Sequence, residues 1–260
     1  MKAVLTATLT RGTPILISAS ADTTIRTWSL ATGAPQHTLQ GHARGVQALA
    51  LDPCSAAPTL TLFSGDSSRE IRAWAIRDSS AAEVPTTAAA DAGPPFAPLL
   101  RHDTGIFALA FDASADLWTA SADRSAKCLA RERGWAADTV LLHPDYVRAV
   151  ALDEERGWAV TGCRDEGVRV WDAASGELAC VYDGHFEDVT GLVVVGSYVV
   201  SVSIDGTVRR WSLKREDVKK AREESEKDGQ AEEEEEPAPK TSMLTEEEER
   251  ELAELMDDSD

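Results

Sequence analysis

The sequence lacks the features that mark secreted, zinc-binding and membrane-spanning proteins. Its four cysteines, at positions 54, 128, 163 and 180, include no CxxC pair, so neither a disulfide framework nor a zinc site is indicated. No apolar stretch reaches eighteen residues, and a membrane helix needs about that length. Arg11 and Pro14 interrupt the apolar N-terminal run, which therefore does not fit a secretory signal peptide. We expect an intracellular protein, cytoplasmic or nuclear.

Basic side chains are in the minority, and this bears on the partners. The chain has 26 Lys and Arg against 45 Asp and Glu, a net charge of −19, of which residues 212–260 contribute −12. An acidic surface repels phosphate backbones. We therefore expect other proteins as partners, basic ones among them, and no direct contact with nucleic acid or membrane.

One pattern recurs five times along the chain. It consists of Ser or Thr, then a turn residue that is usually Asp four positions later, then a β-branched residue and a tryptophan at intervals of three. The complete copies span residues 18–28, 161–171 and 201–211. Two copies are degenerate, because the copy at 64–74 has Ser68 at the Asp position and the copy at 119–129 has Leu129 at the Trp position.

The spacing of the copies indicates a repeat architecture. Their last positions are 46, 55, 42 and 40 residues apart, close to the 40–45 residues of a four-stranded propeller blade. A histidine precedes four of the copies, at positions 42, 102, 143 and 185, twice as Gly-His. With Trp171-Asp172 as its clearest mark, the region from about 1 to 211 resembles the WD40-repeat family.

The resemblance implies an all-β propeller, here of about five four-stranded blades. The residues agree with it, since alternating apolar runs such as Val46–Leu51 suit strands and Asp-Gly or Asp-Glu-Gly turns suit short hairpins. The repeat cores are expected near residues 3–28, 42–74, 102–129, 143–171 and 185–211.

Recurring His, Ser or Thr, and Asp residues superficially resemble a hydrolase triad. A catalytic triad is needed at one cleft, whereas a structural network recurs in every blade. In the WD40 family these positions form a hydrogen-bond network inside the blade. The resemblance places it at His143, Thr161, Asp165 and Trp171, and at His185, Ser201, Asp205 and Trp211. We therefore expect no enzyme and no cofactor or metal site, with a hydrolase built on these residues as the remote alternative.

The predicted domains are a propeller at residues 1–213, interrupted by an insertion loop at 78–98, and an acidic helical or disordered tail at 214–260. Five copies are fewer than the seven blades most common in the family. We favour a chain that lacks two N-terminal blades. A five-bladed or open ring is one alternative, and completion of the open propeller edge by strand sharing or oligomerisation is another.

The end of the tail has the pattern of a short acidic amphipathic helix, with a capping box at Thr245 and Glu248. Its apolar side chains are Leu252, Leu255 and Met256. A solubilising tail is the simpler interpretation, and a helix that docks in a partner's groove is the functional one.

The most probable function on this basis is a protein–protein interaction scaffold or adaptor in a multiprotein complex. By position in the family, the candidate partner-binding residues are Arg44, Asp103, Arg124, Tyr146, Arg148, Arg164, Glu166 and Phe186. A substrate receptor of a ubiquitin ligase is the alternative. Its Trp-Asp-x-Arg docking motif is not met, since Trp171-Asp172 lacks the Arg and Trp211 is followed by Ser212.

Overall fold

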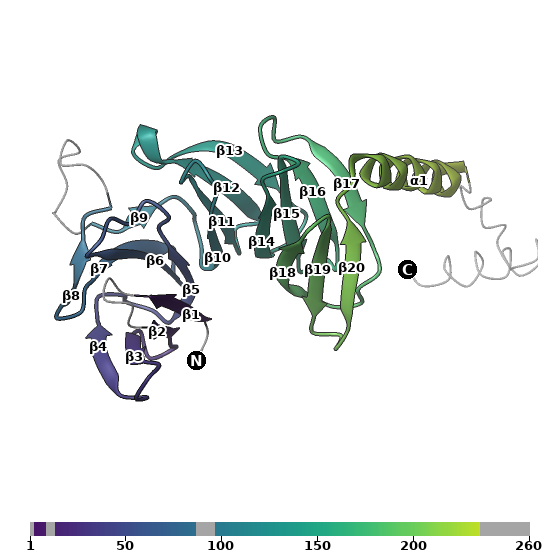
Figure 1. The fold of residues 1–260 in the computed structure, drawn as a ribbon. Coiled ribbons are helices and arrows are strands. Elements are labelled where there is room, and N and C mark those ends of the chain that lie inside the picture. The colour runs from purple at the N-terminus through teal and green to yellow at the C-terminus, as the bar shows by residue number, and fades with distance from the viewer. Residues whose placement is uncertain (1–2, 9–13, 87–96, 235–260) are drawn as a thin grey trace, which may run out of the picture. The chain divides into compact units, whose positions relative to one another are not determined.

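The computed structural model describes residues 3–8, 14–86 and 97–234 (Figure 1). The chain divides into two compact units, Met1–Arg222 and Glu223–Asp260. The first unit consists of consecutive antiparallel sheets in which neighbouring strands follow one another along the chain. This confirms the prediction of an all-β fold built from WD40-type blades.

Four blades have a complete set of strands. Blade one contains β1 (Ala3–Thr8), β2 (Pro14–Ala19), β3 (Ile25–Ser29) and β4 (Pro35–Leu39). Blade two contains β5 (Val46–Leu51), β6 (Leu60–Asp66), β7 (Glu70–Ile76) and β8 (Ala81–Val84). Blade three contains β10 (Ile106–Phe111), β11 (Leu117–Ser121), β12 (Ser125–Ala130) and β13 (Ala136–Leu142). Blade four contains β14 (Val147–Asp153), β15 (Trp158–Cys163), β16 (Val168–Asp172) and β17 (Leu178–Tyr182).

Blade five differs, because the described residues supply only three strands. These are β18 (Val189–Val195), β19 (Tyr198–Ser203) and β20 (Val208–Ser212). After Leu213 the chain enters helix α1 (Arg215–Glu234). Among the described residues, no helix combines the length and apolar character that a membrane crossing requires.

Blades two, three and four are apolar on both faces, and this is why the blades pack in series. Trp74 and Leu62 of blade two lie in one buried cluster with Ile17 of blade one. On the opposite face of blade two, Phe63 lies in a second cluster with Leu117 of blade three. Two further clusters join blade three to blade four and blade four to blade five. Burial of apolar side chains at roughly 25 cal/mol per Å² is the main stabilising contribution of these interfaces.

Part of the segment predicted as an insertion loop belongs to the sheet. Residues 81–84 form β8, the outer strand of blade two, and the short strand β9 (Leu99–Leu100) pairs with β7. The Ala- and Ser-rich composition concealed β8, which is held by an ion pair of 2.6 Å between Arg72 Nη1 and Glu83 Oε1. Residues 87–96 of the predicted loop lie outside the described residues.

The first unit also continues past Leu213, where the sequence suggested its boundary. Val218, in the first turns of α1, is buried in the cluster that contains Trp158 and Val160. Ala221 packs against the same cluster, and Trp158 Nε1 donates a hydrogen bond of 3.0 Å to the Leu213 carbonyl. The start of the charged helix therefore belongs to the blade four and five interface.

Candidate functional site

The predicted network of blade five is assembled from a loop, a turn and two strands. His185, in the loop before β18, lies 2.7 Å through Nε2 from the Ser201 hydroxyl of β19. The same hydroxyl accepts a hydrogen bond of 2.8 Å from the Trp211 indole of β20. His185 Nδ1 lies 3.0 Å from Oδ2 of Asp205 in the turn between β19 and β20. The structure thus brings all four residues together and links the loop, the turn and both strands.

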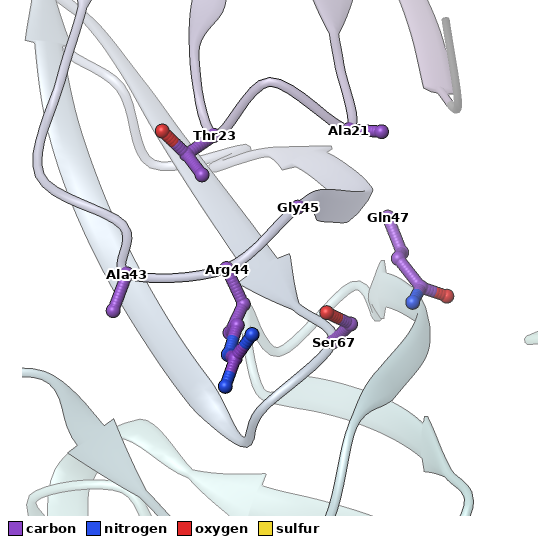
Figure 2. A pocket seen from close by; sticks show the side chains of 7 residues that line it. All are labelled: Ala21, Thr23, Ala43, Arg44, Gly45, Gln47 and Ser67. Atoms are coloured by element: carbon purple, nitrogen blue, oxygen red, sulfur yellow. The ribbon is translucent and has the colours of Figure 1, made fainter.

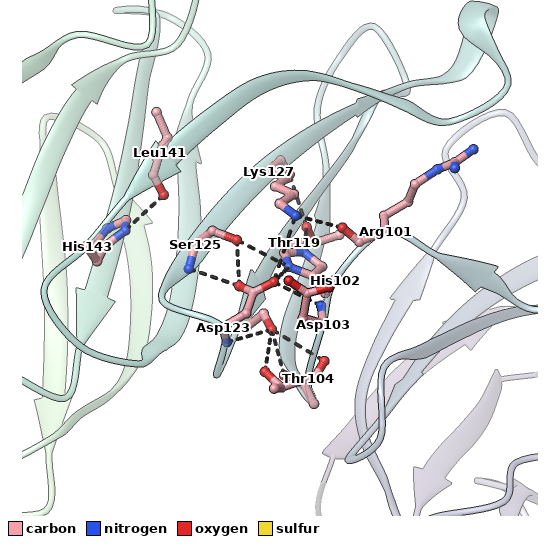
Figure 3. A network of polar contacts seen from close by, with 12 residues as sticks. Arg101, His102, Asp103, Thr104, Thr119, Asp123, Ser125, Lys127, Leu141 and His143 are labelled. Carbon is pink, nitrogen blue, oxygen red and sulfur yellow. Dashed lines mark hydrogen bonds and ion pairs between the residues drawn. The ribbon is translucent and has the colours of Figure 1, made fainter.

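Blade three repeats this arrangement without the tryptophan (Figure 3). His102 lies 2.7 Å from the Thr119 hydroxyl and 2.8 Å from the Asp123 carboxylate. Ser125 also contacts both His102 and Asp123. Leu129, at the tryptophan position, is fully buried in the apolar cluster shared with blade two. The contacts of the histidine with the hydroxyl and the carboxylate are therefore kept in a repeat that lacks the tryptophan.

In blade four the expected link between His143 and Asp165 is absent. His143 Nε2 lies 2.8 Å from the Thr161 hydroxyl, which also accepts from the Trp171 indole. His143 Nδ1, however, lies 3.1 Å from the Leu141 carbonyl. Asp165 instead accepts hydrogen bonds of 2.9 and 2.7 Å from Arg169. A guanidinium offers a carboxylate two charge-assisted bonds, which a neutral imidazole cannot match.

In blade two the carboxylate comes from a residue that the repeat pattern did not single out. Asp66 stands two positions before Ser68, and its Oδ1 accepts hydrogen bonds from Ser68, Arg69 and Glu70. Asp66 Oδ2 lies 3.3 Å from His42 Nδ1. Burial acts to raise the pKa of Asp66, but the nearby His42 imidazole and the hydrogen bonds from Ser68, Arg69 and Glu70 outweigh it and hold that pKa well below its usual range. Asp66 is the last residue of β6, so in this blade the acid comes from the end of the strand and not from the turn itself.

The hydroxyls of these networks are sealed inside the blades. Ser64, Thr119, Thr161 and Ser201 have no exposed surface. A nucleophile must reach its substrate, and these buried hydroxyls offer no accessible site for acyl transfer. The networks can instead stabilise the hairpins in which they lie.

A second cluster of candidate residues lies where blades three, four and five meet. Arg148 at the start of β14 binds Asp188 Oδ2 through Nε and Nη2, at 3.0 and 2.7 Å. Its guanidinium lies 4.5 Å from the centre of the Phe107 ring of β10. Arg164 lies 5.4 Å from the Tyr146 ring centre and 3.8 Å from Asp188 Oδ1. We call Phe107, Tyr146, Arg148, Arg164 and Asp188 the loop-face cluster.

The structure adds two members that the sequence did not point to. Phe107 belongs to blade three and Asp188 to blade five, whereas the predicted residues of the cluster belong to blade four. Asp188 stands three positions after His185, and this spacing is the only feature of the local sequence that marks it as a member of the cluster. Its pairing with Arg148 depends on the packing of β14 beside β18.

The other candidates on these loops are not members of the loop-face cluster. Arg44 is exposed and lines a pocket of about 340 Å³ with Thr23, Gln47 and Ser67 (Figure 2). Asp103, Arg124, Glu166 and Phe186 are exposed. Leu252, Leu255 and Met256 lie outside the described residues.

Two groups of side chains have the spacing to surround a cation, namely His42 with Asp66 and Glu70, and Asp112 with Asp116 and Cys128. Members of both groups are already engaged. Glu70 pairs with Arg72 at 3.0 Å, and Asp112 accepts a hydrogen bond of 3.0 Å from the Trp118 indole. We assign neither group a metal.

Comparison with known proteins finds sequences similar to this chain. The model of the WD domain, G-beta repeat, matches residues 33–75, 138–172 and 176–212. An uncharacterised WD repeat-containing protein of Schizosaccharomyces pombe is 31% identical over 248 residues, which are 94% of this chain and 61% of that protein. Protein ROOT INITIATION DEFECTIVE 3 of Arabidopsis thaliana is 38% identical over 26% of this chain and 16% of its own length.

The chain thus spans less than two thirds of the length of these relatives. Among solved structures, a computationally designed protein superposes with a TM-score of 0.59 at 25% identity, over 82% of this chain and 58% of its own.

Proposed function

This chain belongs to the WD40-repeat family, and from that premise we propose that it is an intracellular interaction scaffold that binds a partner protein through the loop-face cluster. WD40 repeats act in general as protein-interaction modules. The four cysteines are free, which fits a reducing compartment. The proposal assigns the blades no catalysis, because their hydroxyls are buried.

The loop-face cluster carries the proposal because it combines rigidity with exposed recognition groups. Tyr146 is 38% exposed, and half of the Arg164 side chain is exposed. Arg148 and Asp188 hold the neighbouring side chains in place by a two-point ion pair. Tyrosine and arginine are enriched among residues that dominate binding energy, and residues held in place by packing lose little entropy on binding. A basic partner, as the net charge favours, would find the partly exposed Asp145 beside the same loops.

The proposal is tested by affinity purification of the tagged chain with quantitative mass spectrometry. Tyr146→Ala and Arg164→Ala should each reduce recovery of the same partner at least fivefold, because truncation of a hot-spot residue costs about 1 kcal/mol or more. Arg77→Ala removes an exposed arginine directly after β7 that is not a candidate for partner binding, so it is the matched control and should leave recovery unchanged. Equal recovery with all three variants would refute this site. Recovery of ubiquitin-ligase subunits with the wild-type chain would favour the receptor alternative.

A further inference from the structure

The outer edge of blade five is unpaired in the part of the chain that the structure describes. In the first four blades the third strand pairs with an outer strand, namely β4, β8, β13 or β17. In blade five the third strand is β20, and the described strands pair with it only through β19. An open strand edge presents unpaired backbone groups that another strand can bind.

The pairing of β19 with β20 identifies those groups. Ser203 N–H bonds to the Thr207 carbonyl at 3.3 Å, and Leu213 N–H bonds to the Ser197 carbonyl at 2.8 Å. Antiparallel strands alternate bonded and non-bonded pairs. The N–H and C=O groups of Val208 and Arg210 therefore point away from β19. Val208 is also 68% exposed.

A cation in the third strand is paired with a carboxylate in each of the first four blades. The four pairs are Arg26 with Asp22, Arg72 with Glu70 and Glu83, Lys127 with Asp123, and Arg169 with Asp165. The corresponding residue of blade five is Arg209, which forms no ion pair with a described residue. Its Nε is buried without a hydrogen-bond partner, and its guanidinium lies 5.8 Å from the Phe186 ring centre. The turn acid Asp205 is occupied by His185 and Thr207.

Blade two shows where the missing acid would come from. Glu83, which pairs with Arg72, lies on the outer strand β8 and stands opposite Trp74 in the register. The same position in blade five is opposite Trp211, on an outer strand that the described residues do not supply. A buried guanidinium nitrogen without a partner is costly, and a carboxylate on an added strand would satisfy it.

We propose that β20 is the acceptor for a β-strand supplied by a partner protein, which completes blade five. The strand runs antiparallel to β20, bonds the free groups of Val208 and Arg210, and places Asp or Glu opposite Trp211 to pair with Arg209. An apolar side chain covers Val208. This surface is separate from the loop-face cluster and goes beyond the scaffold function proposed there.

The charges of β20 favour a different protein over a second copy of this chain. The strand has the sequence Val208-Arg-Arg-Trp-Ser212, with two cations and no acid. Two such edges would bring like charges together across the pair, which is destabilising.

The test screens a phage library of random nine-residue peptides for those that bind the intact 260-residue chain. Peptides with alternating apolar residues and one acid at a constant position should be enriched. With the best synthetic peptide, the acid-to-amide change and Arg209→Met should each raise the Kd about tenfold, the value for loss of one charge-assisted hydrogen bond. Combining both changes should add little more, because they remove the same interaction.

Three controls separate this result from other causes. Arg169→Met, the same position one blade earlier, should bind the peptide normally once circular dichroism shows that it is folded. A peptide N-methylated at the amides that face β20 should not bind, and this control changes nothing in the protein. Arg164→Ala should bind normally, so that failure of the loop-face cluster and failure of this site are distinguishable.

Binding of the peptide should slow hydrogen exchange at the backbone amides of Val208 and Arg210. Failure to select any binder, binders without the acid, or a Kd unchanged by Arg209→Met would overturn the proposal. A stable dimer of the free chain that Val208→Lys dissociates would also overturn it, because a second copy of the chain would then pair with β20.

Discussion

The histidines that precede the blades differ in what faces their second ring nitrogen. His102 and His185 have a carboxylate there, at 2.8 and 3.0 Å. His143 has the carbonyl of Leu141. Burial, with a smaller contribution from the nearby Arg169 cation, lowers the pKa of His143 to about 4. His143, whose turn acid binds Arg169, therefore resists protonation.

This difference predicts a pH dependence of stability. The unfolded chain protonates His143 near pH 6.5, whereas the folded chain keeps it neutral down to about pH 4. Between these values the unfolded state binds more protons. The stabilisation is therefore complete above pH 6.5 and is lost as the pH falls toward 4, at up to about 1.4 kcal/mol per pH unit.

Urea unfolding at intervals from pH 7 to pH 4.5 measures this loss. His143→Gln should be less stable at pH 7 but should lose less free energy of unfolding across the window. Equal slopes for the wild type and the variant would show that His143 does not titrate in this way.

At the scale of elements, close contact between blades depends on a small residue directly after the buried hydroxyl. A Cβ on Gly65 of β6 would lie 2.7 Å from Ile106, and one on Gly162 of β15 would lie 2.7 Å from Val189 Cγ1. In both interfaces a β-branched residue from the first strand of the next blade fills the space beside the glycine. This residue is Ile106 of β10 in the first interface and Val189 of β18 in the second. In blade five the same position is Val202, which is 40% exposed.

Gly162→Ala should therefore destabilise the chain by about 1–3 kcal/mol, the usual cost of overpacking a core. The measurement is the free energy of unfolding in denaturant. Val189→Ala in the same chain removes the methyl group that the new Cβ meets, so the double variant should cost less than the sum of the two single changes. Strict additivity would mean that the two side chains do not compete for space.

For the whole molecule, the boundary of the first compact unit lies within α1. Val218 is 3% exposed, although it belongs to a helix whose other residues are mostly charged. A chain that ends at Leu213 loses this contact and should unfold several degrees lower than the full chain, since burial of a valine contributes about 1.5 kcal/mol or more.

A chain that ends at Glu224 keeps Val218 and Ala221 and should match the full chain in thermal unfolding. Differential scanning calorimetry of the three chains measures the effect. Equal melting temperatures for the chain ending at Leu213 and the full chain would show that α1 adds no stability.

Much of this fold could be predicted from the sequence. The pattern around Ser201 and Trp211 is local, because a hairpin turn and two short strands determine which side chains share a face. Strand β8 was missed, since a run such as Ala81–Val84 lacks apolar alternation and is defined by its pairing with β7. Asp66 was missed because it stands two positions before the turn position of the pattern, at the end of β6, and the pattern has Ser68 at the turn position.

The sequence by itself determined the repeat, the hairpins, the buried hydroxyls and the acidic character, because each depends on residues within one blade or on composition alone. Only the tertiary structure decided that Arg148 meets Asp188 of the next blade, and that Arg209 has no acid beside it among the described residues. The physical reason is that charged side chains take whichever partner the packing brings nearest, and local sequence does not encode distances between strands that are far apart along the chain.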